Sequence, residues 1–243
     1  DRLVNLGRLE EAREAYRTVV EEHPDCTDAK MGIRHVDYML MKYDGKEPER
    51  YEPPKIEMTE SKRQNLALNE QEFNEQKTRL ESFPTSVYVE STSKCNFYCQ
   101  TCSKGYDPYE AVDLLDDVHE TVKREIFPFS TKISITGFGE PTLAKDFDRN
   151  LTAALDSGAR VEMVTNASTL NYERTEKLMQ HPITIAVSLD GATKETFESI
   201  RRGGSFDRVM EKLLMIKKMR DIYMAGERTC FTINFVALRS NIH

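Results

Sequence analysis

Three cysteines in one short segment are the residues of this chain best suited to chemistry. Cys95, Cys99 and Cys102 are separated by three and then two residues, directly after a strand-like stretch. A [4Fe–4S] cluster takes one thiolate on each iron, and this spacing lets one tight loop offer sulfurs to three corners of the cube. The other two cysteines, Cys26 and Cys230, are isolated in the sequence. The fourth iron would therefore stay open to a small molecule.

Three other interpretations of the cysteines stay open. A structural zinc ion needs four closed ligands, usually from paired knuckles, and no second knuckle follows Cys102. A disulfide framework belongs to small, cysteine-dense domains in oxidising compartments, whereas this chain has 5 Cys in 243 residues. Buried cysteines can also cluster by chance, although the neighbouring Ser, Lys, Asn and Gln are not typical of a core. The spacing favours the open iron–sulfur cluster.

Composition and charge narrow the class of protein. With 39% hydrophobic and 31% charged residues, the chain has material for one sizeable core and an appendage. Its net charge is -7 and its basic residues are scattered, which is not the pattern of a nucleic-acid-binding protein. No apolar run approaches the roughly 20 residues of a membrane span, and no signal peptide opens the chain. Unpaired thiols suit the cytoplasm, so we expect a cytoplasmic protein without nucleic-acid or membrane partners.

The N-terminal residues 1–42 carry a helical pattern. Gly7, Ala12, Tyr16 and Pro24 fall at the marked positions of the second helix of a tetratricopeptide repeat, which this segment resembles. A second amphipathic helix is expected after the proline, and an unrelated helical hairpin is the alternative. One repeat and a half cannot bury its own faces. Since the chain also begins without Met, we expect it to be a piece of a longer protein.

Residues 43–82 are predicted to connect this segment to the rest of the chain. Prolines among charged residues predict a linker up to about residue 58. A polar helix is expected over 59–81. Its apolar positions are few, so it is expected to be a partly exposed strut, and we assign it no chemistry.

Residues 83–243 alternate between strand and helix patterns. Segments rich in Val, Ile, Thr or Phe predict strands at 86–91, 132–136, 160–164, 183–188 and 229–237. Apolar residues at helical spacing predict two helix faces, one of Val112, Leu115, Val118, Val122 and Ile126 and one of Phe206, Val209, Met210, Leu213 and Ile216. This alternation implies parallel strands joined by right-handed crossovers. The expected fold class is α/β, either a (βα) barrel or an open doubly wound sheet.

Polar clusters follow each of the first four predicted strands. The cysteines follow the first, and the others are Gly137, Gly139 and Glu140 after the second, Asn166 after the third, and Ser188 and Asp190 after the fourth. Ligands bind beyond the carboxyl ends of parallel strands, which meet at one edge of the sheet. Each cluster alone could be a turn or a helix cap. Together they predict one site at this edge.

From these motifs, residues 84–243 resemble the radical S-adenosylmethionine (SAM) superfamily. In that family a CxxxCxxC loop holds a [4Fe–4S] cluster, and the open iron chelates the amino and carboxylate groups of SAM. The resemblance implies that Cys95, Cys99 and Cys102 are the cluster ligands. It also implies a partial TIM-type barrel of six βα units. This chain would contain five of the six strands, because it stops just after the fifth.

The resemblance implies roles for the other clustered residues. Gly137, Gly139 and Glu140 match the glycine-glycine-glutamate motif that receives the methionine ammonium. Glycines allow close approach of the backbone to a ligand, and a carboxylate suits an ammonium. Ser188 and Asp190 match positions that contact the SAM ribose or carboxylate in relatives.

Two further residues match the family, and three depart from it. Arg201 lies where some relatives place an arginine on the SAM carboxylate, with a surface basic pair as the alternative. Asn166 matches a Thr-Asn-Gly motif in which Ala167 replaces the glycine. Thr101 stands where the family commonly has an aromatic against adenine, and Phe138 stands at the first glycine of the glutamate motif. These departures concern adenine packing and leave the three cysteines unchanged.

The family's chemistry defines the expected function. An electron donor such as flavodoxin or ferredoxin reduces the cluster, and SAM is cleaved to methionine and a 5′-deoxyadenosyl radical that abstracts hydrogen from a substrate. The motifs resemble the branch that contains peptide maturases, and helical repeats would bind an extended peptide or protein substrate. The alternatives are a radical SAM methyltransferase or small-molecule enzyme, and a non-enzymatic repeat scaffold with a zinc-binding cysteine loop.

Overall fold

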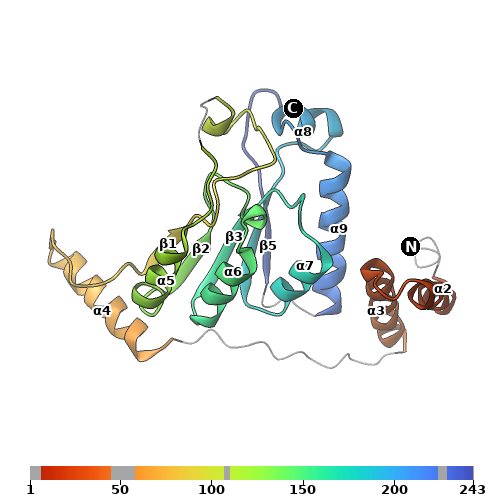
Figure 1. Ribbon diagram of the computed structural model, residues 1–243, viewed down its shortest axis with the longest axis horizontal. Helices are drawn as coiled ribbons and strands as arrows, with labels where there is room; N and C mark the ends of the chain where they lie inside the picture. Colours follow the sequence, from red (N-terminus) through yellow and green to blue (C-terminus); the bar gives the residue numbers. More distant parts are fainter. Residues whose placement is uncertain (1–6, 45–57, 107–109, 224–228, 243) are drawn as a thin grey trace.

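A parallel β-sheet forms the centre of the molecule (Figure 1). The computed structural model describes residues 7–44, 58–106, 110–223 and 229–242. Five strands pair in the order of the sequence, and every neighbouring pair is parallel. They are β1 (Ser86–Val89), β2 (Lys132–Ile135), β3 (Arg160–Thr165), β4 (Ile183–Ser188) and β5 (Cys230–Asn234).

The helices between the strands decide between the two expected architectures. They are α5 (Asp116–Glu125), α6 (Phe147–Asp156), α7 (Tyr172–Met179), α8 (Lys194–Ile200) and α9 (Phe206–Ile222). Parallel crossovers are right-handed, so a sheet in sequential order has its crossing helices on one face, whereas a doubly wound sheet reverses its strand order. Figure 1 shows α5, α6 and α7 on the same side of the sheet. The fold is the partial (βα) barrel.

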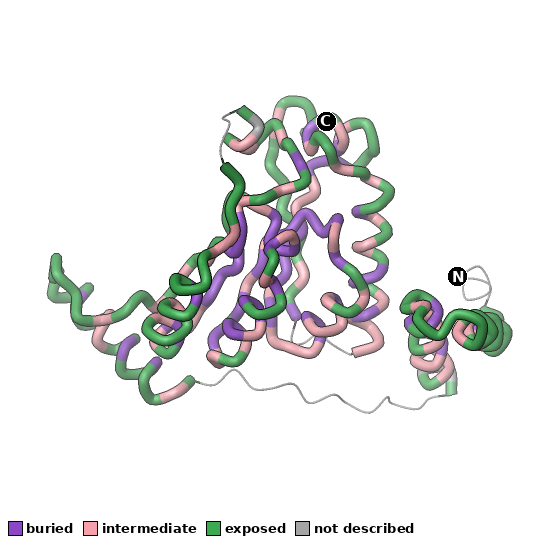
Figure 2. Tube along the Cα trace, viewed as in Figure 1, coloured by how far each residue is buried: buried purple, intermediate pink, exposed green. Residues whose placement is uncertain are grey.

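The register of the strands gives the sheet an apolar and a polar face. Ile133, Val161 and Ile183 stand in one row across β2, β3 and β4, and each is at most 1% exposed. They belong to the main hydrophobic core, and Figure 2 shows the buried residues concentrated along the middle of the sheet. Successive strand residues point to opposite faces. The next row along is polar and comprises Ser134, Glu162 and Thr184.

The first and fifth strands are shorter than their composition predicts. The sequence predicts strands over 86–91 and 229–237, but the last residues of both ranges lie in loops beyond β1 and β5. After β1 the backbone pairs with the segment before α5 instead of with β2, through the Ser93 N–H to the Val112 carbonyl and the Leu114 N–H to the Ser91 carbonyl. Residues typical of strands therefore extend into the loops at the carboxyl edge.

The prediction of an apolar helix face before β2 is wrong for the first three of its five residues. Val112 and Leu115 precede α5 and are 53% and 65% exposed, and Val118 on that helix is 42% exposed. The buried residue of α5 is His119, while Val122 packs against the main core. The face predicted for α9 is confirmed in the residues that reach the main core, Phe206, Val209, Leu213 and Ile216.

The N-terminal helices form a small unit that touches the sheet domain. Helices α2 (Leu9–Glu22) and α3 (Thr27–Tyr43) pack together around Ala12 and Val36. Helix α3 also contacts α7 and α9. There the Arg34 guanidinium pairs with the Glu176 carboxylate and lies 3.0 Å from the Tyr223 hydroxyl. The two helices fit the predicted helical segment, and their likeness to a tetratricopeptide repeat stays a prediction.

Helix α4 (Glu60–Asn74) is shorter than the helix predicted over 59–81. Beyond it the chain folds back, because the buried Glu72 carboxylate accepts hydrogen bonds from the N–H groups of Glu81 and Ser82. Most of α4 is exposed, as expected of a strut (Figure 2). The predicted linker falls mainly on residues 45–57, which lie outside the described residues.

Lys62 fastens α4 to the sheet domain. Its side chain is 1% exposed, and its Nζ donates to the Phe127 carbonyl over 2.9 Å and to the Ser130 carbonyl. These two carbonyls belong to the turn after α5. The ammonium thus supplies donors for backbone oxygens that are buried with it.

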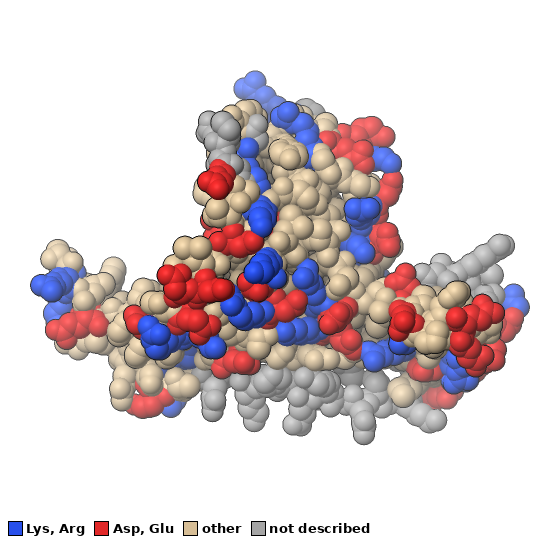
Figure 3. Space-filling view, viewed as in Figure 1, with Lys and Arg blue, Asp and Glu red and all other residues tan. Residues whose placement is uncertain are grey.

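Charged side chains of both signs intermingle over the lower part of the face shown in Figure 3. The exposed ion pairs of the described residues include Arg149 with Asp116 and Lys194 with Asp207. Exposed pairs of this kind contribute little to stability. In the part of the chain that the structure describes, no helix combines the length and apolar character needed to cross a membrane.

Replacing Lys62 with Met should lower the free energy of unfolding by about 1–3 kcal/mol, because two buried carbonyl oxygens lose their donor. Urea unfolding followed by circular dichroism measures the change. Arg63→Ala, at the exposed neighbouring position, is the matched control and should stay within about 0.5 kcal/mol of the parent. Equal stability of the Lys62→Met chain and the parent would contradict the role of the ammonium.

Candidate functional site

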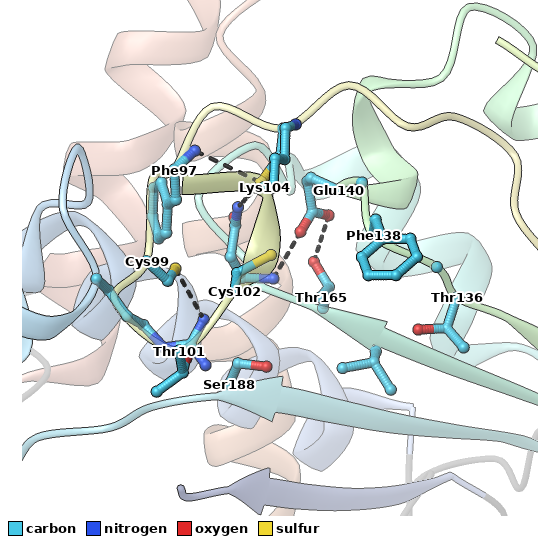
Figure 4. A pocket seen from close by; sticks show the side chains of 16 residues that line it. Phe97, Cys99, Thr101, Cys102, Lys104, Thr136, Phe138, Glu140, Thr165 and Ser188 are labelled. Atoms are coloured by element: carbon cyan, nitrogen blue, oxygen red, sulfur yellow. Dashed lines mark hydrogen bonds between the residues drawn. The ribbon is translucent and has the colours of Figure 1, made fainter. Parts of the chain in front are cut away.

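The carboxyl edge of the sheet carries a pocket formed by the loops after β1 to β4 and by the segment after α8 (Figure 4). Nine of the ten residues predicted from the sequence line this pocket: Cys95, Cys99, Cys102, Gly137, Gly139, Glu140, Asn166, Ser188 and Arg201. The tenth, Asp190, is fully buried outside the lining. The parallel sheet thus brings the predicted clusters together at one edge.

The cysteine loop is held in place through its backbone. The Tyr98 N–H donates to the Arg202 carbonyl over 2.7 Å, and the Gln100 N–H donates to the Ile200 carbonyl over 2.8 Å. The Phe97 ring is 3% exposed and meets the Phe197 ring edge to face, with centroids 6.5 Å apart. Helix α8 and the segment after it therefore support the loop between the cysteines. Sequence reasoning did not find this support.

All three thiols are free and only partly buried. Burial raises the pKa of the Cys95 and Cys99 thiols, while the positive charge of Arg201 acts in the opposite direction on Cys99. Metal binding requires thiolates and releases these protons. Within the described residues, no group of three or more His, Cys, Asp and Glu side chains is arranged to hold a single metal ion.

Glu140 is the hydrogen-bonding centre of the loops after β2 and β3. It is 2% exposed, and its Oε1 accepts hydrogen bonds of 2.6 Å from the hydroxyls of Thr142 and Thr165. Its Oε2 accepts from the Asn166 N–H over 2.6 Å. Burial raises the pKa of Glu140, against these hydrogen bonds. Because Oε2 has one protein donor, it keeps acceptor capacity for a ligand.

Gly139 lets two loops touch. A Cβ atom at this position would lie 2.0 Å from the Thr92 carbonyl oxygen and 2.7 Å from that of Lys94. The Glu140 N–H donates to the same Lys94 carbonyl over 2.7 Å. At Gly137 an added Cβ would meet only a flexible side chain. The glycine beside the glutamate is therefore needed where the loop after β2 presses against the start of the cysteine loop.

Asn166 connects the end of β3 to the cysteine loop. Its Nδ2 donates to Asn96 Oδ1 over 2.9 Å and lies 4.0 Å from Cys95 Sγ. Its Oδ1 accepts from the Ser168 hydroxyl over 2.7 Å, and Asn96 Nδ2 donates to that hydroxyl over 2.8 Å. The side chain predicted to face a cofactor thus also orients the loop that carries the cysteines.

Arg201 and Asp190 form an ion pair at the edge of the pocket. Arg201 Nε lies 2.9 Å from Asp190 Oδ2, and the two side chains are 11% and 0% exposed. Arg201 Nη1 lies 3.9 Å from Cys99 Sγ. The alternative of a surface basic pair is thereby wrong for Arg201, whereas its neighbour Arg202 is exposed.

Several lining residues were not assigned to the site from the sequence. They are Phe97, Thr101, Lys104, Thr136, Phe138, Val164 and Thr165. Lys104 follows the last cysteine by two positions, and its Nζ donates to the Ser93 carbonyl over 2.9 Å. Phe138 is 65% exposed, and its position inside the glycine-glutamate motif was the signal that could have found it.

A partial (βα) barrel with three free cysteines at the carboxyl edge of its sheet defines an α/β protein with a cysteine site in the usual ligand-binding place of its fold. Residues 89–229 match the family model described as the radical SAM superfamily. The chain belongs to this superfamily, whose members bind a [4Fe–4S] cluster and SAM. The resemblance drawn from the sequence is confirmed at this level.

Two curated enzymes illustrate the range of relatives. The AdoMet-dependent heme synthase of Methanosarcina barkeri is 29% identical over 138 residues, which cover 56% of this chain and 40% of the relative. The mycofactocin maturase MftC of Mycolicibacterium smegmatis is 29% identical over 165 residues, which cover 65% of this chain and 39% of the relative. The chain thus spans about two-fifths of the length of these relatives.

A solved structure shares the fold at low sequence identity. Streptococcus suis SuiB bound to the precursor peptide SuiA matches with a TM-score of 0.50 and 19% identity. The match covers 77% of this chain and 44% of that chain. At this identity the likeness concerns the fold alone.

Replacing Ala167 with glycine should make the protein more stable. The φ of Ala167 is 62°, a conformation that favours glycine, and the residue is fully buried where the family motif has glycine. Ala167→Gly should raise the free energy of unfolding by about 1 kcal/mol, as measured by urea unfolding. Ala153→Gly, inside α6, is the matched control and should lower it by a similar amount, about 1 kcal/mol. A loss of stability in Ala167→Gly would contradict the strain at this position.

Proposed function

We propose that this chain is the SAM-cleaving core of a radical SAM enzyme. The observation that carries the proposal is the meeting of three free thiols, Cys95, Cys99 and Cys102, in one pocket with the loops after β2, β3 and β4. Membership of the superfamily supports the same function.

The donor set fits a [4Fe–4S] cluster. Three partly buried thiols line one pocket, and the cations Lys104 and Arg201 line it beside them. Cys95, Cys99 and Cys102 would each hold one iron, and the fourth iron would be left for SAM. When bound, the cluster supplies the electron that cleaves SAM to methionine and a 5′-deoxyadenosyl radical.

The side chains around the cysteines would orient SAM. Glu140 has acceptor capacity for the methionine ammonium, next to the backbone of Gly137 and Gly139. Ser188 offers a hydroxyl to the ribose or the carboxylate, and the Arg201 guanidinium offers N–H donors to the carboxylate. Asn166 would lie beside the cofactor, as predicted from the sequence, and it holds the cysteine loop through Asn96.

Asp190 would act differently from its sequence-predicted role. A fully buried carboxylate paired with Arg201 is not placed to touch SAM itself. We assign it to the orientation of Arg201. The ribose or carboxylate contact predicted for the loop after β4 then falls to Ser188, which lines the pocket.

We further propose a peptide or protein as the substrate. The maturase among the relatives supports this choice, and so does the helical unit of α2 and α3 packed against α7 and α9, because helical repeats bind extended chains. The enzyme would work in the cytoplasm with a small electron-transfer protein, such as flavodoxin or ferredoxin, as donor. The heme synthase relative favours the second candidate, a small-molecule reaction.

Cys99→Ala should abolish the formation of 5′-deoxyadenosine, because one iron loses its thiolate. The measurement is the amount of 5′-deoxyadenosine formed from SAM and dithionite after anaerobic reconstitution with iron and sulfide. Cys26→Ala removes a thiol outside the pocket and is the control that should keep full activity.

Two outcomes would contradict the proposal. One is unchanged 5′-deoxyadenosine formation by Cys99→Ala. The other is a colourless parent protein that holds one zinc ion after reconstitution, which would favour the scaffold with a zinc-binding loop instead.

A further inference from the structure

The Arg201 guanidinium has a second partner besides its counter-ion. Its Nη1 lies 3.9 Å from Cys99 Sγ, within hydrogen-bonding distance of sulfur, as the dashed line at Cys99 in Figure 4 shows. Its Nε lies 2.9 Å from Asp190 Oδ2. The contact with Asp190 is an ion pair without a hydrogen bond, whereas Nη1 donates to the sulfur. The attraction of the Asp190 carboxylate therefore holds the guanidinium beside the Cys99 thiol.

Asp190 is held in place by hydrogen bonds from a second segment of the chain. Its Oδ1 accepts a hydrogen bond of 2.9 Å from the Val236 N–H, and its carbonyl accepts one of 2.9 Å from Asn241 Nδ2. Both donors belong to the loop after β5. Asp190 Oδ2 accepts no hydrogen bond from the described residues and is compensated by the charge of Arg201. The loops after β4 and β5 together thus determine where the guanidinium points.

The Cys95 and Cys99 sulfurs differ in the donors that face them. Cys95 Sγ accepts from the Phe97 N–H over 3.5 Å and has the neutral Asn166 amide at 4.0 Å. Cys99 Sγ has the charged guanidinium of Arg201. Among the hydrogen bonds to cysteine sulfur in the described residues, this one alone comes from a cation.

We propose that Arg201, aimed by Asp190, donates a hydrogen bond to the Cys99 thiolate and raises the reduction potential of the cluster that the thiolate holds. Three thiolates give the cluster negative charge, and reduction by one electron from an external reductant adds another. A cation bonded to one sulfur stabilises the reduced form more than the oxidised form, and hydrogen bonds to the sulfurs tune such potentials. The inference rests on the proposed function and adds to the carboxylate contact expected of Arg201.

The test is a redox titration of the reconstituted protein with dithionite, without SAM, followed by electron paramagnetic resonance. Arg201→Gln should disfavour cluster reduction about tenfold, which moves the midpoint of this one-electron couple by about 59 mV to more negative values. Arg202→Gln removes the same charge from the exposed neighbour and should leave the midpoint unchanged. SAM is left out so that its carboxylate does not enter the result.

A double variant controls for misfolding of the Arg201→Gln protein. Arg201→Gln alone leaves the Asp190 carboxylate buried without its cation. Arg201→Gln with Asp190→Asn removes both charges, so the net charge is unchanged, and it should still shift the midpoint to more negative values. That shift would report the loss of the cationic donor beside the sulfur rather than a change in net charge.

The outcomes distinguish a failure of the proposed function from a failure of this inference. If the parent protein assembles no cluster, the proposed function fails and this inference fails with it. If the parent and both variants assemble clusters with equal midpoints, the inference alone is overturned. Weaker SAM binding by the variants at an unchanged midpoint would also overturn the inference alone, because Arg201 would then serve only the carboxylate.

Discussion

Three thiols must be kept apart, free and facing one pocket, and the backbone of the cysteine loop meets this constraint. Hydrogen bonds from the Tyr98 and Gln100 N–H groups to the end of α8 and the segment after it hold the loop between its cysteines. The buried Phe97 ring anchors it to α8 through Phe197. Packing against a neighbouring crossover thus fixes the loop without any link between the sulfurs. Glu140 and Asn166 contact the placed loop through hydrogen bonds to Lys94 and Asn96.

The loops after β2 and β3 meet the cysteine loop through buried polar groups. Glu140 accepts hydrogen bonds from both loops, and Asn166 continues the network to Asn96 between the first two cysteines. Buried polar networks of this kind specify one arrangement when their members are satisfied. The close contact at Gly139 adds a steric condition, because a larger residue would separate the loops. The edge of the sheet is consequently a preorganised site rather than a set of independent turns.

Nine of the ten residues that pattern and family resemblance assigned to the site line the pocket, because parallel topology brings the loops after successive strands to one edge. Local pattern also predicted the strands and their parallel arrangement. It could not predict what distant segments do to a side chain. Asp190 is buried because Arg201 and Val236 meet it there. Val118 follows a helical period and is still 42% exposed, since that flank of α5 has no neighbour to cover it in the described structure. Lys62 is buried while its ammonium donates hydrogen bonds to the carbonyls of a turn that is distant in the sequence.

The central claim is that three cysteines hold a cluster whose fourth iron is open to SAM. Electron paramagnetic resonance of the reduced, reconstituted chain tests it directly, because a ligand bound to the cluster changes the electronic environment of the iron. We expect the signal of the reduced cluster to change shape and position when SAM is added, and to stay unchanged with adenosine, which lacks the methionine part of SAM. A reduced cluster whose signal is indifferent to SAM would contradict the claim.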